Sequence, residues 1–355
     1  MAILDRYILK EVSSIFLFGL TLFTMLLAIN HLFFLARFAL EAQVPLQVVT
    51  RLLLLSVPKL MSLALPMALL LGALLTVSRL SDRNEVIAMR TSGISLGRVA
   101  LPVLAAGLFV SAAGVVFGEW IAPIADDRYR EEFRLASGQP QVKRGYVLFR
   151  EQQGSQVSVV YARGFGDAED TLEEVTLTQS DAGRVVHVIQ AARAHHAAGE
   201  WEFQDGTLYL LTGPATVETR FARMKVGIAR TPREILLQQK DPSEMTIKEL
   251  RAYIRVLRAS GESVVQYLVW LHSRLAIPAS SAIFALIAVP LGLRPHRSGR
   301  SIGLGLTLLI VIVYYVLIST TLALGQTGRL PPLLAAWSPN LIVGSVGAYL
   351  LWRAR

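Results

Sequence analysis

Long apolar runs and one polar middle segment divide the chain. Six runs approach or exceed the roughly 20 residues that an α-helix needs to cross a lipid bilayer. They are Val12–Ala36, Leu52–Val77, Val99–Phe117, Leu275–Leu293, Ile302–Leu324 and Leu333–Trp352. The first run is too long for the core of a cleaved signal peptide, and no small-residue cleavage site follows it. The pattern therefore predicts three membrane spans, a polar domain and three further spans.

The polar segment alternates between apolar and polar residues in the manner of β-strands. Trp201 and Phe203 flank Glu202, and Asp205-Gly206 then precedes a second run, which predicts a hairpin with a two-residue turn. Similar short runs are Gly145–Arg150, Gln156–Arg163, Leu172–Thr178, Arg184–Gln190 and Thr216–Val226. Many short strands separated by turn residues are typical of a sandwich or jelly roll. The expected fold is an α-helical membrane bundle of six transmembrane helices with an inserted extracytoplasmic all-β, jelly-roll-like domain.

Several of these strands are apolar on both faces, as in VSVVYA and LYLL. One interpretation is an ordinary closed core. The other is an open sandwich whose interior admits an acyl chain, with groove candidates at Val159, Tyr161, Leu208 and Leu210.

After Pro242 the period of the apolar residues becomes helical, and Thr246 or Ser243 is a plausible helix cap. We therefore expect transmembrane helices 1–3 in residues 1–121 and the β-domain in residues 122–243. Connecting helices would occupy residues 244–273, and transmembrane helices 4–6 residues 274–355.

Basic residues in the short loops predict the orientation, because Lys and Arg accumulate on the cytoplasmic side. One side carries Arg6, Lys10, Arg79, Arg83, Arg90, Arg98, Arg294, Arg297, Arg300, Arg353 and Arg355. The other carries only Arg37, Arg51 and Arg329. We expect both termini in the cytoplasm and the β-domain on the far side of the membrane.

The overall composition agrees with a membrane protein, since 53% of the residues are hydrophobic and only 17% are charged. The formal charge is +9, yet residues 122–274 hold 20 basic and 20 acidic residues, so the excess lies at the ends of the spans. A nucleic-acid-binding protein would concentrate its excess on a folded polar domain instead. This distribution predicts a membrane anchor and no nucleic-acid partner.

The sequence lacks a nucleotide-binding loop and the H-E-x-x-H motif of zinc proteases. There is no cysteine and no phosphate-binding G-x-x-x-x-G-K-[ST] loop. His195 and His196 are adjacent on an expected strand edge or turn, so their side chains diverge and a metal site is not favoured. We expect no catalytic residue, no cofactor and no metal, and any work on a substrate must be powered from elsewhere.

A charged stretch, SDRNEVIAMRTSGIS, separates the second and third runs. Asp82 or Ser81 can cap a helix of about 10 residues, roughly 15 Å long, that begins near Arg83, and Gly93 is a suitable stop. Such a helix could be a rigid lever docked on a separate ATPase. It could also lie on the lipid surface, with Arg83 and Arg90 near anionic headgroups.

These motifs together resemble the LptF/LptG family of lipopolysaccharide export permeases. SDRNEVIAMRTSGIS resembles the coupling helix of the family, and MTIKELRAYIRVLRASG resembles the helix that closes its β-domain. HSRLAIP, AVPLGLRPHRSGRSIG and GRLPPLLAAWSPN resemble the family's fourth span, its cytoplasmic exit and the entry to its last span. Trp270 departs from the family, which often has an acid at this position.

The resemblance implies a mechanism and partners. A paralogous or identical permease pairs with the chain, and a cytoplasmic ATPase dimer binds the coupling helices. Lipopolysaccharide enters between the paired bundles, and ATP-driven closure expels it onto a periplasmic bridge protein of jelly-roll fold. On this reading the protein is a multi-pass inner-membrane transporter subunit rather than an enzyme. Residues that would couple to the ATPase are Glu85, Arg83, Val86, Met89 and Arg90.

Cations near the outer ends of the first two spans fit such a substrate. Lys59 lies about 12 Å along the helix from Arg51, near the outer headgroup boundary, where a phosphorylated glycolipid presents its anions. The lipid-binding candidates are Arg37, Arg51, Lys59 and His31. Snorkelling of long side chains to the interface is the alternative explanation. Two other functions remain open, an ATPase-coupled mechanical transmitter and a periplasmic assembly scaffold, neither of which carries lipid.

Overall fold

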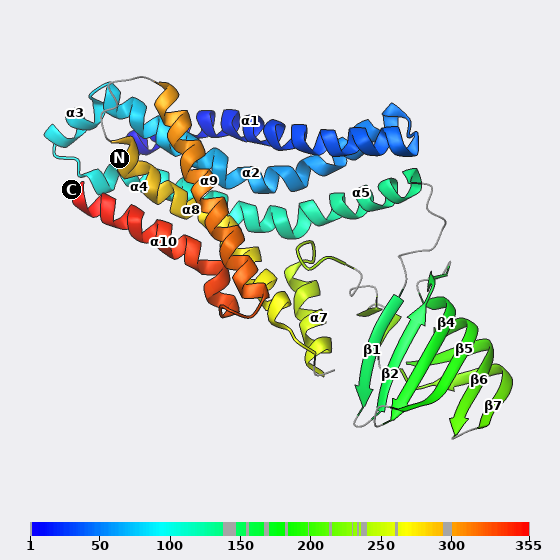
Figure 1. Ribbon diagram of the computed structural model, residues 1–355. Helices are drawn as coiled ribbons and strands as arrows, with labels where there is room; N and C mark the ends of the chain where they lie inside the picture. The colour runs from blue at the N-terminus through cyan, green and yellow to red at the C-terminus, as the bar shows by residue number, and fades with distance from the viewer. Residues whose placement is uncertain are drawn as a thin grey trace. The chain divides into compact units, whose positions relative to one another are not determined.

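A computed structural model describes residues 2–137, 147–153, 156–166, 170–181, 184–197, 199–212, 215–228, 230–232, 234–235, 240–259, 262–293 and 300–354. The chain divides into two compact units (Figure 1). The helical unit comprises Met1–Gly138 and Val265–Arg355, and the β-unit comprises Gln139–Val264. Each unit is described separately below.

The described residues of the helical unit include six helices that are long and apolar enough to cross a membrane, as the sequence predicted. Its elements are α1 (Ala2–Ala42), α2 (Leu46–Asp82), α3 (Glu85–Thr91), α4 (Leu96–Val116), η1 (Phe117–Ile121), α5 (Ala122–Ala136), α8 (Val265–Gly292), α9 (Arg300–Gln326) and α10 (Pro332–Arg353). Both termini and α3 lie at one end of this unit, here called the terminal end (Figure 1). The α1–α2 connection and the end of α5 lie at the opposite end, here called the far end.

Several helices are much longer than the apolar runs that predicted them. The 41 residues of α1 correspond to about 60 Å, roughly twice the thickness of a bilayer core. The third span continues from α4 through the π-helical turn η1 into α5. The expected β-domain boundary at residue 122 therefore differs from the structure, because polar residues 122–136 extend this helix instead of starting a strand.

Helix α2 lies in the centre of the bundle, and small residues allow its neighbours to approach closely. A Cβ atom on Gly72 would lie 3.1 Å from the backbone oxygen of Val12 on α1. A buried polar contact adds specificity to the packing of the later helices. The Tyr314 hydroxyl donates to Asn340 Oδ1 at 3.0 Å, and the Asn340 amide donates to the Ala276 carbonyl at 2.7 Å. This network joins α8, α9 and α10.

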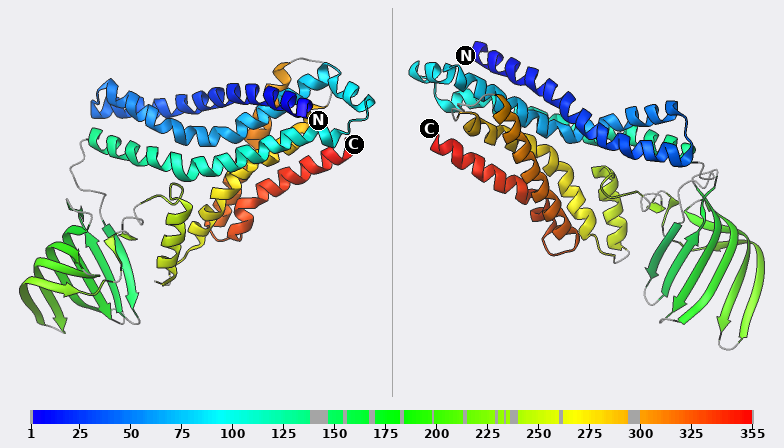
Figure 2. Two further views of the ribbon diagram at one scale, coloured as in Figure 1. Left: turned by 180° about the vertical axis from the view of Figure 1, so that it is seen from behind. Right: turned by 45° about the horizontal axis from the view of Figure 1, so that its top comes forward.

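The β-unit contains one antiparallel sheet with the order β1-β2-β4-β5-β6-β7, and β3 also pairs with β4 (Figure 2). The strands are β1 (Val147–Gln153), β2 (Gln156–Ala162), β3 (Gly164–Phe165), β4 (Thr171–Asp181), β5 (Arg184–Ala197), β6 (Glu200–Thr212) and β7 (Ala215–Val226). The inserted all-β domain is thus confirmed. Within the described ranges its strands form a single sheet rather than two separate layers, with β1 and β7 at its edges.

The predicted hairpin at Asp205-Gly206 is wrong, because β6 continues past these two residues without a chain reversal. Asp205 has φ +53°, and Glu174, in the same cross-strand row, has φ +47°. This row runs across the sheet, through the link between β2 and β3 and through β4, β5, β6 and β7. It is here called the crease. Its members are Arg163, Glu174, Ala192, Asp205 and Ala222.

Along each of these strands, every second residue faces the core, and the crease shifts this alternation by one residue. In β4 the buried residues are Leu172 before it and Val175 after it. In β6 they are Phe203 before it and, partly buried, Leu208 after it. Each segment that crosses the row shifts by one residue there. The register is therefore kept, and one apolar face continues across the bend. This shift produced the turn-like pattern in the sequence.

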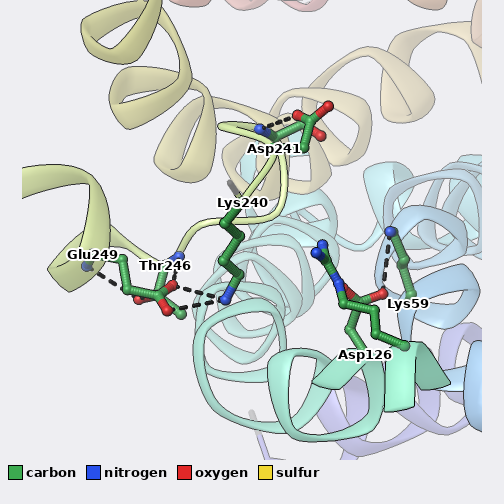
Figure 3. A network of polar contacts seen from close by, with 8 residues as sticks. Lys59, Asp126, Lys240, Asp241, Thr246 and Glu249 are labelled. Carbon is green, nitrogen blue, oxygen red and sulfur yellow. Dashed lines mark hydrogen bonds and ion pairs between the residues drawn. The ribbon is translucent and has the colours of Figure 1, made fainter. Parts of the chain in front are cut away.

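A helix, α7 (Ile247–Ala259), follows the sheet and begins at the predicted cap. The Thr246 backbone N–H donates to Glu249 Oε2 at 2.7 Å, and the Glu249 N–H donates back to Thr246 Oγ1 at 3.3 Å (Figure 3). This is a capping box. Lys240 also bonds both Glu249 oxygens, at 3.0 and 3.1 Å.

Arg230 follows the last strand, β7, in the chain, and its charged side chain is buried, with an exposure of only 3%. Its guanidinium lies 5.2 Å from the ring centre of Phe149 and bonds Glu262 at 2.5 Å. Its carbonyl accepts a hydrogen bond from the Trp201 indole at 2.8 Å. These contacts join the sheet core to the segment that precedes α8.

Candidate functional site

The charged stretch between α2 and α4 folds into the short helix α3, which is seven residues long rather than about ten. Asp82 is the last residue of α2, so it does not cap α3 as predicted. Ser81 instead donates to the Leu293 carbonyl at 3.1 Å. The chain turns at Asn84, which has φ +62°, a conformation that Asn adopts more readily than most residues. This turn delays the start of α3 to Glu85.

The end of α3 matches the prediction. Gly93 has φ +82°, and its N–H donates to Arg90 O while the Ile94 N–H donates to Met89 O, both at 3.0 Å. This pair of bonds is the Schellman motif. Ser95 then caps α4, since its hydroxyl accepts from the Arg98 N–H at 3.3 Å. The segment is therefore held between two long helices by defined turns.

Residues 93–97 also read G-I-S-L-G, which has the form of a hydrolase nucleophile elbow. Such an elbow requires a strand before the serine and a helix after it. Here a helix, α3, precedes Ser95, and the serine hydroxyl is engaged as a helix cap. The pattern carries no nucleophile.

The apolar residues of α3 face two directions. Val86 is only 5% exposed, and Met89 packs beside it against the core of the helical unit. Ile87 points outward and is 59% exposed. The bundle therefore covers Val86 and partly covers Met89. The outward surface of α3 includes Ile87 and Arg90, and Arg83 is exposed in the turn before the helix.

Glu85 lies between the buried side and the outward side of α3, and its side chain is 29% exposed. The Tyr7 hydroxyl on α1 donates to Glu85 Oε2 at 3.0 Å. The other oxygen, Oε1, lies 3.8 Å from Arg83 Nη1. Glu85 is thus fixed by an intramolecular contact while one oxygen remains oriented toward a cation.

At the far end, acidic residues of α5 contact the cations predicted to bind lipid. Lys59 Nζ lies 3.3 Å from Asp126 Oδ1 (Figure 3), and Asp126 also accepts from Arg130 Nε at 3.2 Å. Arg51 Nη1 bonds Glu132 Oε1 at 2.9 Å. These cations are therefore accompanied by carboxylates. Arg37 is exposed on α1.

His31 belongs to an aromatic cluster between α1 and α5. Its ring lies 5.6 Å from Tyr129 and 5.9 Å from Phe34. Phe133 continues the cluster and stacks on Phe38 at 4.2 Å. The cluster packs the far ends of the two helices together beside Lys59 and Asp126.

The four groove candidates do not share one face of the sheet. Cross-strand pairing places Val160, Leu177, Ile189 and Leu208 in one row, so Leu208 and Leu210 belong to the core face. Val159 and Tyr161 alternate with Val160 and belong to the opposite face. A single groove lined by all four is therefore wrong. The core face is well covered near β2, and less so near β6, where Leu208 and Leu210 are partly buried.

Sequence reasoning missed the contribution of α5. Its acids Asp126 and Glu132 and its aromatic residues Tyr129 and Phe133 were assigned to the β-domain. The signal was present, because residues 126, 129, 130 and 133 recur with helical spacing. Tyr7, the partner of Glu85, was missed because 78 residues separate the pair along the chain.

The model of the family described as lipopolysaccharide export system permease LptF/LptG matches residues 6–353, which is nearly the whole chain. The chain belongs to the LptF/LptG family. The match extends across both halves of the helical unit and across the β-unit. Family membership, together with six apolar helices in the described residues, makes the chain a multi-pass protein of the inner membrane and a permease component.

Curated relatives carry both family names. LptG of Escherichia coli strain K12 is 28% identical over 314 residues, which cover 84% of each chain. LptF of the same strain is 25% identical over 372 residues, covering 99% of this chain and 95% of the relative. LptG of Haemophilus influenzae is 23% identical over 313 residues, covering 85% and 84%. These values do not separate the two paralogues.

Proposed function

We propose that the chain is the permease subunit of an ATP-driven exporter that extracts lipopolysaccharide from the inner membrane and passes it to a periplasmic bridge. The observation that carries the proposal is the family match over residues 6–353, in which the relatives are named lipopolysaccharide export permeases. The structure adds a short helix held between two spans at one end of the bundle and paired charges at the other.

In this proposal the terminal end faces the cytoplasm. The short loops there carry most of the basic residues, as the positive-inside rule requires of the cytoplasmic side. Both termini and α3 lie at that end of the helical unit (Figure 2). The β-unit follows α5, which leaves the opposite end, so it belongs to the periplasm.

A separate cytoplasmic ATPase dimer would act on α3. The helix is joined to α2 by a two-residue turn and to α4 by a capped turn, so a displaced α3 must displace these spans. Ile87 supplies an exposed apolar contact, and Arg83 and Arg90 supply charge. The exposed part of the Glu85 carboxylate would accept a cation from the ATPase.

The far end would receive the glycolipid. Phosphate carries more charge than a carboxylate and forms strong charge-assisted hydrogen bonds with Lys and Arg. Lys59, Arg51 and Arg37 are therefore the proposed headgroup contacts, with His31 beside them. Asp126 and Glu132 would be the counter-ions that these cations exchange for phosphate.

The sheet would then hold the acyl chains on its core face. Leu208, Leu210, Phe221 and Met224 lie on or near the less covered side of this face, at β6 and β7. Among the described strands, β1 and β7 lie at the edges of the sheet, where a bridge protein of similar fold could add a strand. A paralogous or identical permease would complete the membrane cavity.

Photo-crosslinking tests this proposal in the membrane complex purified from its native host. A photoreactive residue at Leu210 is expected to capture lipopolysaccharide during ATP turnover, and one at Val159, on the opposite face, is expected to capture much less. Equal capture without ATP, or capture of protein alone at both positions, would contradict the lipid path.

A mechanical transmitter is the second candidate, and the counter-ions on α5 favour it, because ion pairs at Lys59 and Arg51 can serve structure alone. It predicts that these cations can be neutralised without loss of export. A pure scaffold further predicts that Glu85 is dispensable.

A further inference from the structure

The first three turns of α1 contact the elements on both sides of α3. Asp5 accepts two hydrogen bonds from the Arg98 guanidinium at the start of α4, both at 2.6 Å. Glu11 forms an ion pair with Arg79, close to the end of α2. The cytoplasmic ends of three spans are therefore joined through one helix.

The third contact reaches α3 itself. Tyr7 lies between Asp5 and Glu11 in the sequence, and its hydroxyl donates to Glu85 Oε2 at 3.0 Å. We call the three α1 residues the N-terminal clamp: Asp5, Tyr7 and Glu11.

The geometry at Glu85 gives Tyr7 a specific task. A carboxylate that accepts a hydrogen bond at one oxygen has a defined orientation at the other. Here Oε1 is directed toward the side occupied by Arg83, at 3.8 Å, and the side chain is 29% exposed. The hydroxyl carries no charge, so it orients the carboxylate without neutralising it. An external cation approaching Oε1 would meet a pre-oriented acceptor.

We propose that Tyr7 is a positioning residue for the Glu85 carboxylate, and that the N-terminal clamp makes the start of α1 part of the coupling element. This rests on the proposed function, in which an ATPase acts on α3. Displacement of α3 then moves α1 as well as α2 and α4. Because α1 also carries His31 at the far end, one helix connects the coupling segment to the aromatic cluster there.

The test uses the complete complex, with its ATPase, reconstituted in lipid vesicles that contain lipopolysaccharide. The measured quantity is lipopolysaccharide released per ATP hydrolysed. Tyr7→Phe is expected to lower this ratio about five-fold, as for loss of one hydrogen bond to a charged group that is partly exposed. Co-purification of the ATPase and thermal stability should remain at the wild-type level. Tyr349→Phe, at an exposed tyrosine of α10, is the matched control and should change nothing.

Two comparisons separate positioning from a general structural role. Glu85→Gln should lower the ratio at least as much as Tyr7→Phe, and the double variant should be no worse than Glu85→Gln alone. The assignment would be overturned if the double variant lowered the ratio by the product of the two single effects. It would also be overturned if Tyr7→Phe had the same ratio as wild type.

Charge reversal tests the clamp independently of Tyr7. Asp5→Arg and Arg98→Asp should each lower the ratio of lipopolysaccharide released to ATP hydrolysed. The double variant should recover at least half of the wild-type ratio. A double variant as impaired as the single variants would overturn the clamp. If wild type itself releases no lipopolysaccharide on ATP hydrolysis, the proposed function fails. If wild type is active and all clamp variants match it, only the present inference fails.

Discussion

Lys59 on α2 is paired with Asp126 on α5, with 3.3 Å between Nζ and Oδ1 (Figure 3). The lysine side chain is 46% exposed, and its partner is 15% exposed. Exposed ion pairs contribute only about 0–1 kcal/mol to stability. A more highly charged phosphate can therefore replace the carboxylate at little cost, so the ion pair is compatible with a binding role for Lys59.

Lys59→Met should lower the capture of phosphorylated lipopolysaccharide by the purified complex about five-fold, because one charge-assisted hydrogen bond is lost. The same variant should bind enzymatically dephosphorylated glycolipid as wild type does. Capture is measured by quantitative mass spectrometry of co-purified lipid. Lys248→Met, at an exposed lysine of α7, is the matched control.

The counter-ion provides the opposite test of the same site. Asp126→Asn leaves Lys59 without this competing carboxylate, so lipopolysaccharide should be retained more strongly. If both variants reduce capture equally, the ion pair has a structural role and the transmitter function gains support.

Val86 and Ile87 are neighbours on α3, but Val86 is buried and Ile87 is exposed. Truncating each in turn should distinguish an effect on stability from an effect on binding of the ATPase. Val86→Ala removes buried methyl groups and should destabilise the helical unit by about 1–2 kcal/mol, which lowers the melting temperature in detergent. Ile87→Ala should leave the melting temperature unchanged but reduce co-purification of the ATPase. Equal melting temperatures for both variants would contradict the assigned orientation of α3.

Gly206 should be intolerant of a side chain, because a Cβ atom would lie 2.4 Å from the Gln190 carbonyl oxygen and from Phe221 Cζ. Gly206→Ala is expected to destabilise the sheet by about 1–3 kcal/mol through overpacking. Amide hydrogen exchange in β6 and β7 of the full chain should become at least about five-fold faster. Gly227→Ala is the control, since its Cβ would meet nothing within 4 Å. Unchanged exchange in Gly206→Ala would contradict the close packing at the crease.

Acid should weaken the start of α7. Burial tends to raise the pKa of the Glu249 carboxyl, but hydrogen bonds from Thr246 and from Lys240 outweigh it and hold the pKa below 4.5. A lowered folded-state pKa means that the stabilisation is present above 4.5 and is lost as the pH falls through the folded value. Glu249→Gln should cost about 1 kcal/mol at neutral pH, as for a lost cap, and progressively less in acid.

The check is thermal unfolding of wild type and Glu249→Gln in detergent, measured from neutral pH down into acid. The two curves should converge as the pH falls through the lowered pKa of Glu249, where its carboxyl becomes protonated. A constant difference at every pH would show that the charge of Glu249 is not involved.

Much of the fold was predictable because membrane crossing depends on simple physics. Apolar runs located all six spans, and local chemistry located the Gly93 stop and the Thr246 cap. Hydropathy reports where a helix lies in lipid, however, and not where it ends. It could not show that α1 and α5 continue beyond the apolar runs, and α5 was therefore assigned to the wrong unit.

The remaining errors come from contacts between distant parts of the chain. Asp205-Gly206 has the chemistry of a turn, but the neighbouring strands β5 and β7 extend past it and keep it within β6. Asn84 gave no periodic signal, yet its positive φ sets the start of α3. The acids that accompany Lys59 and Arg51 could be recognised only after α5 was placed beside α2.

The most direct test of the account is whether α3 touches a nucleotide-hydrolysing subunit in the assembled complex. The chain has no cysteine, so Ile87→Cys introduces a single reactive thiol on the outward surface of α3. A thiol-reactive photocrosslinker at this position should join the permease to the ATPase, with a yield that differs between the ATP-bound and nucleotide-free states. Crosslinking to lipid alone, with no ATPase adduct in either state, would contradict the coupling role of α3.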